Sequence, residues 1–288
     1  MSIIKVSDLT YCYSRGTPFE KVALDKVRFN IEKGEFVAII GHTGSGKSTL
    51  VSHLNGLITP ESGSVYLDGE DIFAKGYDLR KVRFKVGLVF QYPEYQLFEE
   101  TVYRDIAFGP KNMGLSDDEV KQRVMAAAKA LEIRPELLKK SPFELSGGQK
   151  RRVAIAGVIA MQPKVLVLDE PAAGLDPRGR ERVMRLIDDY RKNTGSTVII
   201  VSHSMETAAK YADRVIVLNE GSLFFEGNPD ELFRKTDELS EIGLSVPPIT
   251  RIFHRLISEG LDLPDNVYTA QRAAEVILER CGKGGGLC

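Results

Sequence analysis

The sequence feature that most constrains the fold is the nine-residue run GHTGSGKST, which extends from Gly41 to Thr49. The apolar stretch FVAII precedes this run, and the segment LVSHLNGL follows it. A strand, then the pattern G-x-x-x-x-G-K-[ST], then a helix is typical of a phosphate-binding loop. The sequence therefore predicts a buried β-strand whose carboxyl end leads through a glycine turn into a helix.

Each residue type in this loop has a chemical reason to be there. The glycines allow backbone N–H groups to turn inward around phosphate oxygens, and a helix that begins near Lys47 directs its positive end toward them. Lys47 adds a positive charge, and Ser48 supplies an oxygen ligand for Mg²⁺. A glycine turn with a surface lysine is the alternative, and the flanking strand and helix disfavour it. The expected nucleotide-binding residues are Gly41, His42, Thr43, Gly44, Ser45, Gly46, Lys47, Ser48 and Thr49, with His42 and Thr43 contributing only their backbone.

Three further apolar runs resemble the strand before the loop. These are VGLVF before Gln91, VLVLDE closing at Glu170, and TVIIVSH ending at His203. Continuous apolar runs separated by helical patterns are typical of parallel strands that are covered on both faces. The predicted fold class is therefore α/β, with helices after Gly46, after the cap residue Ser116, after Gly148 and from Pro177.

The chain divides into regions of different character. The segment ALDKVRFNIEKGEFVAII alternates apolar and polar residues, which predicts an antiparallel β layer at the N-terminal edge. We expect a nucleotide-binding domain over residues 1–235, with a helical subdomain inserted at about 92–160. Residues 236–288 are predicted to form a small C-terminal helical domain with two short helices and a flexible tail, GKGGGLC.

Composition excludes some functions. The chain has 39 basic and 40 acidic residues and a formal net charge of -1, which gives no support to nucleic-acid binding. Its three cysteines, Cys12, Cys281 and Cys288, have no metal-ligand spacing and suit reduced thiols in the cytosol. No apolar stretch is long enough to cross a bilayer, so any work at a membrane is expected to go through partners.

A pair of carboxylates narrows the chemistry. Asp169 and Glu170 lie at the carboxyl end of the run VLVLDE, where ligands bind in open parallel sheets. Asp169 is expected to hold Mg²⁺ through water, and Glu170 is placed to orient or deprotonate an attacking water. Two solvated acidic residues are the alternative, which the neighbouring phosphate-binding loop makes less favourable. The sequence thus predicts nucleoside triphosphate hydrolysis.

The run LSGGQKRRVAIAGVIA, which begins at Leu145, resembles the signature sequence of ATP-binding cassette (ABC) ATPases. The resemblance implies a P-loop ABC ATPase fold with a RecA-like parallel core, and ATP and Mg²⁺ as cofactors. It also implies a head-to-tail pair of subunits, with each ATP held between two chains. The residues expected to bind the partner's nucleotide are Ser146, Gly147, Gly148, Gln149 and Asp176, the last of which belongs to the D-loop motif AAGLD.

The remaining motifs of this family fall in order along the cassette. Gln91 matches the Q-loop glutamine, which reaches the Mg²⁺ and touches the membrane partner. His203 matches the switch histidine that contacts the γ-phosphate and is expected, with Glu170 and Gln91, to be catalytic. Tyr13 is where the family stacks an aromatic ring on adenine, although Tyr11 is close enough to be that ring instead.

Narrower fingerprints resemble the ATPases of energy-coupling factor (ECF) transporters, and among them the second, A-prime or CbiO-like type. They are GTPFEKVAL, GHTGSGKST, QYPEYQLFEETVYRDIAFGPKN and FELSGGQKRRVAIAG. The resemblance implies a heterodimer with the paralogous A subunit at the cytoplasmic face of the cell membrane, and a homodimer in isolation stays open. It also implies that residues 236–288 serve in dimerisation, because the segment GLSVPPIT matches the part through which the two ATPases of this family associate. A transmembrane T protein and an interchangeable S protein, which captures a vitamin or a transition-metal ion, would complete the transporter. The stretch YPEYQLFEE is the expected contact with the T protein, or alternatively a surface loop packed on its own domain.

Other classes of ABC protein fit less well. Chromosome-maintenance ATPases interrupt the cassette with long coiled coils, and translation-type ATPases carry two cassettes in one chain. The ATPase of an ordinary ABC importer is the nearer alternative, but importers with regulatory domains have larger, β-rich C-termini. The sequence leaves open which vitamin or metal ion is carried, and whether the chain pairs with itself or only with its paralogue.

Overall fold

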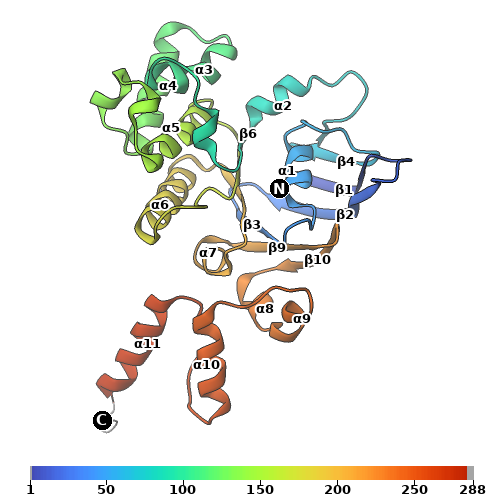
Figure 1. Ribbon diagram of the computed structural model, residues 1–288, viewed down its shortest axis with the longest axis vertical. Helices are drawn as coiled ribbons and strands as arrows, with labels where there is room; N and C mark the ends of the chain where they lie inside the picture. The colour runs from blue at the N-terminus through green and yellow to red at the C-terminus, as the bar shows by residue number, and fades with distance from the viewer. Residues whose placement is uncertain (1, 284–288) are drawn as a thin grey trace.

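Two β-sheets and the helices around them form the chain, and the computed structural model describes residues 2–283 (Figure 1). The larger sheet has the strand order β10-β9-β3-β8-β7-β6. Its strands are β3 (Phe36–Ile40), β6 (Val86–Val89), β7 (Val165–Asp169), β8 (Thr197–Val201), β9 (Arg214–Asn219) and β10 (Ser222–Gly227). Every pair in this sheet is parallel except β9 with β10, which confirms the predicted parallel core.

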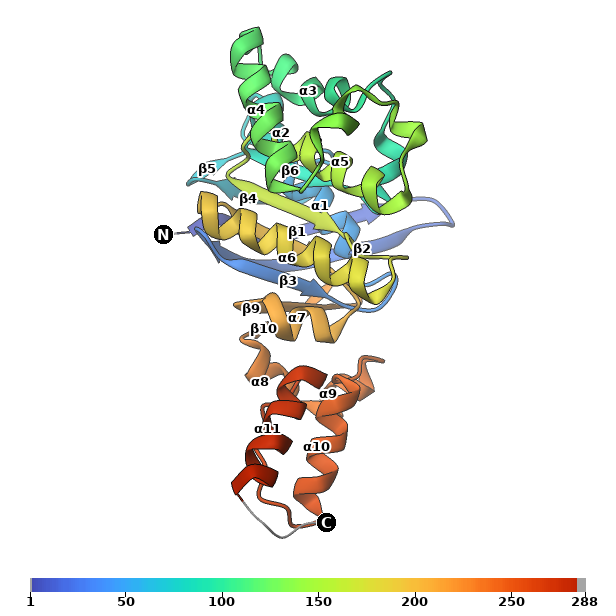
Figure 2. The same cartoon turned by 90° about the vertical axis from the view of Figure 1, so that its left-hand side faces the viewer.

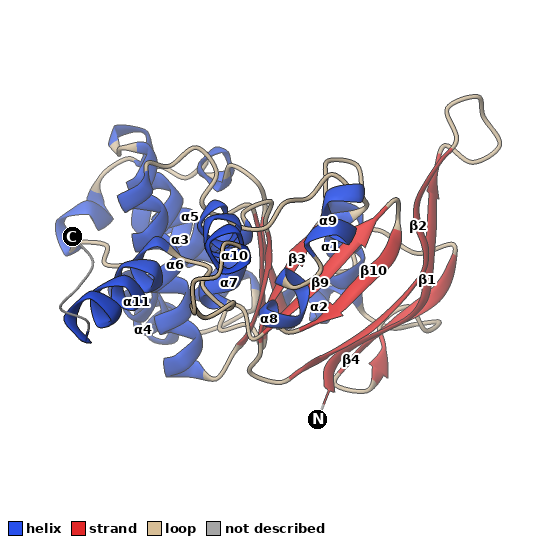
Figure 3. Cartoon of the chain, turned by 90° about the horizontal axis from the view of Figure 1, so that it is seen from below, coloured by secondary structure: helices blue, strands red, loops and turns tan. Residues whose placement is uncertain are grey.

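The smaller sheet is the predicted antiparallel layer at the N-terminal edge. Its order is β2-β1-β4-β5, and its strands are β1 (Ser2–Tyr13), β2 (Lys21–Glu32), β4 (Ser62–Leu67) and β5 (Glu70–Asp71). Figure 3 shows β1 and β2 on one side of the parallel sheet and most of the helices on the other. The two sheets therefore enclose the helix that follows the phosphate-binding loop.

Strand β3 explains why its sequence is apolar throughout. Phe36, Ala38 and Ile40 pack into a core cluster with the helices, while Val37 and Ile39 pack into a second cluster with the antiparallel sheet. All five side chains are buried because successive residues of a strand point to opposite faces and both faces are covered. The loop at the end of β3 is thus fixed by two cores at once.

The predicted helices are all present. The core and its insert contain α1 (Lys47–Leu54), α2 (Leu79–Lys85), α3 (Val102–Asn112), α4 (Asp117–Ala130), α5 (Gly147–Ile159), α6 (Pro177–Thr194) and α7 (Met205–Tyr211), with short 3₁₀ turns at Pro93–Gln96, Pro135–Lys139 and Pro142–Glu144. Helix α4 begins with a capping box in which Ser116 and Glu119 bond to each other's backbone N–H groups. The insert between β6 and β7 is therefore helical, as expected.

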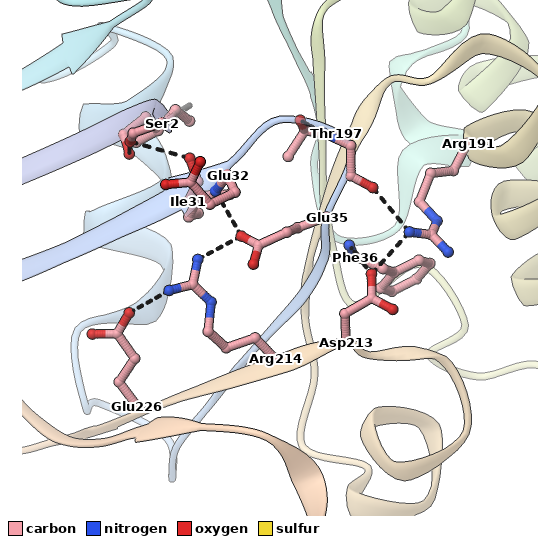
Figure 4. A network of polar contacts seen from close by, with 12 residues as sticks. Ser2, Ile31, Glu32, Glu35, Phe36, Arg191, Thr197, Asp213, Arg214 and Glu226 are labelled. Atoms are coloured by element: carbon pink, nitrogen blue, oxygen red, sulfur yellow. Dashed lines mark hydrogen bonds and ion pairs between the residues drawn. The ribbon is translucent and has the colours of Figure 1, made fainter.

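Ion pairs connect the amino-terminal end of β9 to the residue before β3, to the carboxyl end of β10 and to helix α6 (Figure 4). Arg214, at the start of β9, lies between the carboxylates of Glu35 and Glu226. Nearby, the guanidinium of Arg191 on α6 donates to the Gly34 carbonyl at 2.9 Å and to Asp213 Oδ2 at 2.8 Å. These contacts lie at the end of the sheet opposite the phosphate-binding loop.

Beyond β10 the chain forms α8 (Pro229–Phe233), α9 (Thr236–Glu241), α10 (Pro248–Ser258) and α11 (Ala270–Lys283), of which α10 and α11 extend away from the sheets (Figure 2). Leu239 and Val246 pack into the main core. A separate small cluster joins the last two helices and consists of Phe253, Val267, Ala273 and Val276. The boundary of the C-terminal domain stays a prediction. Residues 284–288, which include most of the predicted tail and Cys288, lie outside the described residues.

Within residues 2–283, no helix combines the length and the apolar character that crossing a lipid bilayer requires.

Candidate functional site

The phosphate-binding loop is held in a shape that only glycine permits at one key position. Gly46 has φ +102°, and a Cβ added there would lie 2.4 Å from the backbone oxygen of Ala23. Both the dihedral angle and the close approach exclude a side chain. Next to it, Lys47 Nζ donates to the carbonyl oxygens of Gly41 at 2.7 Å and His42 at 2.8 Å. Burial lowers the pKa of Lys47, while the carboxylates of Glu170 and Asp169 act in the opposite direction.

A cavity of about 330 Å³ opens beside this loop, within the size range of ligand pockets. It gathers most of the predicted site residues from separate parts of the chain. Its lining is Tyr13, Lys21, Ala23, Thr43, Gly44, Gly46, Lys47, Ser48, Thr49, Gln91, Asp169, Glu170 and Val201. The loops that follow β3, β6 and β7 meet here because parallel strands end at the same edge of the sheet.

Oxygen ligands suited to Mg²⁺ line this cavity. Ser48 Oγ donates to Asp169 Oδ2 at 3.0 Å, and Gln91 lines the same cavity. Burial raises the pKa of Asp169, and the Ser48 hydroxyl bond counteracts that shift. A hydroxyl, an amide oxygen and one carboxylate fit Mg²⁺, which in proteins is usually held by one or two carboxylates together with substrate phosphates. The residues present therefore fit the predicted ion.

Glu170 is held in an unusual conformation. Its φ of 49° places it in the left-handed region, and its N–H donates to Val201 O at 3.0 Å. Its Oε1 accepts from the backbone N–H of His203 at 3.0 Å and lies 2.7 Å from His203 Nδ1, which donates when the carboxylate is ionised. Gln91 and Glu170 also line an adjoining cavity of about 240 Å³ that includes His203. The three predicted catalytic residues are thus neighbours.

The two candidate adenine-stacking rings have different surroundings. Tyr13 is 40% exposed and lines the cavity, and its hydroxyl lies 3.2 Å from Thr49 Oγ1. Tyr11 packs edge-on against His53, with ring centroids 5.0 Å apart, on the side of the antiparallel core. Of the two rings, Tyr13 is the one that lines the cavity.

The signature residues do not line this cavity. Ser146 is the N-cap of α5, and Gln149 Oε1 accepts from the Ser146 N–H at 2.9 Å. A Cβ added to Gly147 or Gly148 would meet no heavy atom within 4 Å among the described residues, apart from the adjoining backbone of its own helix. Asp176, the other residue predicted to act on a partner's nucleotide, caps α6 by accepting from the Gly179 N–H at 2.8 Å.

Two contacts were not expected from the sequence. Lys21 lines the cavity, and its Nζ would lie 3.6 Å from a Cβ at Gly44 in the phosphate-binding loop. Lys21 pairs with Tyr13 across the β1–β2 ladder, so its place in the cavity depends on a hairpin register that no local sequence pattern specifies. The second is the side chain of His42, whose Nε2 lies 3.0 Å from Asn219 Oδ1 at the end of β9. We expected only the backbone of His42 to contribute.

Comparison with known proteins identifies the family of this chain. A family model described as ABC transporter matches residues 24–173. The Energy-coupling factor transporter ATP-binding protein EcfA2 of Clostridium acetobutylicum is 54% identical over 276 residues, which are 96% of each chain. The protein of the same name from Clostridioides difficile is 51% identical over 290 residues and the full length of both.

Solved structures of ABC cassettes are also similar to this chain. Among them is cbiO1 from Clostridium perfringens, described as part of the ABC transporter complex cbiONQ. It has a TM-score of 0.75 and 42% identity, over 88% of this chain and 98% of its own. A dimeric post-hydrolysis state of the cassette MJ0796, bound to ADP and Pi, has a TM-score of 0.70 and 32% identity, over 78% and 98% of the two chains.

Proposed function

The chain belongs to the EcfA2 family of ECF transporter ATP-binding proteins, and from this premise we propose that it powers uptake of a vitamin or a transition-metal ion through membrane-embedded partners. As an ABC transporter ATPase it binds and hydrolyses ATP. The observation that carries the proposal is the shared cavity of the phosphate-binding loop, Asp169, Glu170 and Gln91. Gln91 is also next in sequence to an exposed aromatic turn.

The polar and aromatic groups of the cavity divide the proposed reaction among them. The loop N–H groups and the ammonium groups of Lys47 and Lys21 bind the phosphates, while Tyr13 stacks on the adenine. Glu170 orients or deprotonates the attacking water, and the bond from His203 holds its carboxylate. Ser48, Gln91 and Asp169 would hold Mg²⁺, which when bound neutralises charge on the phosphate oxygens.

We infer that the signature residues act on a nucleotide bound by another chain. Among residues 2–283, a Cβ at Gly147 or Gly148 would meet no heavy atom within 4 Å outside the adjoining helix backbone, so the described fold gives no steric reason for glycine at either position. Their N–H groups open a helix, which is a favourable place for an anion. The dimeric MJ0796 cassette supports this arrangement. The proposed partner is a paralogous ECF ATPase, or a second copy of this chain in isolation.

Two surfaces fit the other proposed partners. Four aromatic side chains close to Gln91 in sequence are exposed: Tyr92 (44%), Tyr95 (86%), Phe98 (60%) and Phe108 (45%). Exposed apolar side chains of this kind suit contact with an apolar partner. We assign this surface to the transmembrane T protein, with the S protein, which binds the solute, reached indirectly. The chain would then lie peripherally at the cytoplasmic face of the cell membrane.

The second surface lies on the C-terminal helices α10 and α11. Its exposed apolar side chains are suited to pairing of the two ATPases, and they are Ile252, Ile277 and Leu278.

Purification from membranes tests the proposal. A tagged chain should bring with it a second ATPase and integral membrane proteins, and in vesicles this assembly should accumulate solute only when ATP is supplied. The matched control is Glu170→Gln, which should co-purify with the same proteins but fail to drive uptake. Recovery of the chain without any membrane protein, with no ATP-dependent uptake by its host membranes, would contradict the proposal.

A further inference from the structure

One buried arginine on helix α5 bonds to two other segments of the chain, the turn that contains Glu94 and the backbone at Ala173. Arg151 lies on α5, five residues after Ser146, and is 2% exposed. Its guanidinium forms a two-point ion pair with Glu94, from Nε to Oε2 at 3.1 Å and from Nη2 to Oε1 at 2.8 Å. A planar guanidinium bound at two points to a carboxylate fixes orientation as well as distance.

The third nitrogen of Arg151 points to a different segment. Nη1 donates to the carbonyl of Ala173 and lies 3.5 Å from the carbonyl of Pro171. These residues follow Glu170 directly, and the Ala173 N–H closes a turn by donating to Glu170 O at 3.1 Å. The same segment leads to Asp176, the cap of α6. Arg151 therefore holds the backbone on the carboxyl side of the proposed catalytic base.

At its other end the ion pair reaches the surface. Glu94 belongs to the short turn Pro93–Gln96, between Tyr92 and the 86% exposed Tyr95. A force on these aromatic rings would move Glu94, and the two-point ion pair would transmit the movement to Arg151. Such chains of packed and hydrogen-bonded groups can carry energetic coupling between two sites.

We propose that Arg151 is the positioning residue that couples the aromatic turn at Tyr92–Gln96 to the backbone beside Glu170. Movement of a bound membrane partner thereby shifts the backbone at the hydrolysis site, and a shift of that backbone moves the surface that the partner contacts. This inference rests on the proposed function, because it takes the aromatic turn as the partner's contact. Arg151 itself cannot touch the partner, since its side chain is 3% exposed.

The test separates coupling from stability by removing both charges together. Glu94→Gln alone leaves a buried, uncompensated guanidinium and should destabilise the fold. The double variant Arg151→Met/Glu94→Gln has no such charge and should melt closer to the unchanged protein. In vesicles carrying the complete transporter, solute uptake per ATP hydrolysed should still fall by about 3- to 30-fold in the double variant. A general loss of active protein lowers uptake and hydrolysis together, so it leaves this ratio unchanged.

The chain offers a matched control at the opposite end of the sheet. Arg191 also donates to a carboxylate, that of Asp213 (Figure 4), and to a backbone carbonyl, that of Gly34. The double variant Arg191→Met/Asp213→Asn should keep uptake per ATP within about twofold, because these two residues are remote from the aromatic turn.

Two results would overturn this inference while leaving the proposed function intact. One is a folded Arg151→Met/Glu94→Gln assembly whose uptake per ATP is unchanged, and the other is an equal loss in the Arg191 control. If the unsubstituted assembly shows no ATP-dependent uptake, the proposed function is wrong and this inference is overturned with it.

Discussion

The chain contains two glycine loops that each open a helix, and their surroundings differ completely. In the phosphate-binding loop, a Cβ at Gly46 would meet the backbone of Ala23 at 2.4 Å, so the chain's own packing requires glycine. In the signature loop, a Cβ at Gly147 or Gly148 would meet nothing within 4 Å beyond the adjoining helix backbone, in the part of the chain that the structure describes. The first loop is therefore complete within one chain, and the second fits a role that requires another chain.

The difference extends to the polar groups around each loop. Lys47 and Ser48 of the phosphate-binding loop line one cavity together with Asp169 and Glu170. The polar groups of the signature loop are occupied in capping α5, as in the bond from the Ser146 N–H to Gln149. A loop that only caps its own helix has no need of two glycines, because glycine is a poor helix former.

The largest expected effect is on hydrolysis at the first loop. Glu170→Gln should lower the ATP hydrolysis rate of the assembled ATPases by about 10²- to 10⁴-fold, which is roughly 3 to 5 kcal/mol of barrier, because it removes a positioned base. Binding of ATP should persist, since the phosphate contacts come from the loop. A steady-state assay and a nucleotide-binding titration check both statements. Full turnover, with the paralogue equally mutated, would remove Glu170 from the mechanism.

Alanine substitutions in the two loops test the comparison itself. Gly46→Ala should lower the free energy of unfolding by about 1 to 3 kcal/mol, because it forces a side chain into a left-handed, crowded position. Gly148→Ala should change it by less than about 1 kcal/mol, with a small gain possible, because glycine is costly within a helix. Denaturant unfolding of both variants measures the difference. Equal destabilisation would mean that the signature loop is also constrained by its own chain.

A bulky residue in the second loop should act only on the assembly. We predict that Ser146→Arg lowers ATP hydrolysis by more than about tenfold, or about 1.4 kcal/mol, because the side chain would occupy the space where the other chain's nucleotide binds. Nucleotide binding to the chain's own phosphate-binding loop should be unchanged. The rate in the complete assembly and a binding titration of the isolated chain test this pair of statements. Unchanged hydrolysis would contradict a shared site.

The smallest effect concerns a buried histidine behind the first loop. His53 on α1 is fully buried, and burial lowers its pKa, while the bond to Thr49 O at 2.7 Å partly opposes that shift. The unfolded chain therefore binds the proton more readily than the folded chain. The free energy of unfolding should fall below about pH 6.5 by at most about 1.4 kcal/mol per pH unit.

Denaturant unfolding between pH 7 and pH 5 checks this slope, with His53→Phe as the control. The phenylalanine variant should show a shallower slope over this interval. An identical slope in both proteins would mean that His53 does not titrate differently in the folded and unfolded states.

Most of the fold could be predicted because the strongest signals are local. The buried strands around the first loop read as continuous apolar runs, and the Ser116 capping box marks the start of α4. The comparisons also confirm the ECF resemblance that the signature, Q-loop and hairpin segments indicated. Lys21 was missed because its place in the cavity depends on the pairing of β1 with β2, which the sequence alone does not specify.

The ion pair between Arg151 and Glu94 was missed for a related reason. The two residues lie 57 positions apart, and nothing in the spacing of either segment indicates that they meet. Tyr11 and Tyr13 could not be separated from the sequence either, because a local irregularity of the β1–β2 register between Tyr11 and Cys12 affects which ring reaches the cavity. In all three cases the outcome depends on how two separate segments pair or pack, which the pattern of either segment alone does not specify.

The central claim is that ATP is hydrolysed only between two chains, and one measurement tests it most directly. The ATP hydrolysis rate per chain is measured on serial dilution, together with the mass of the species in solution, with and without the paralogous ATPase. We predict that the rate per chain falls toward zero as the paired species dissociates. A constant rate from a species with the mass of one chain, 31.9 kDa, would contradict the account.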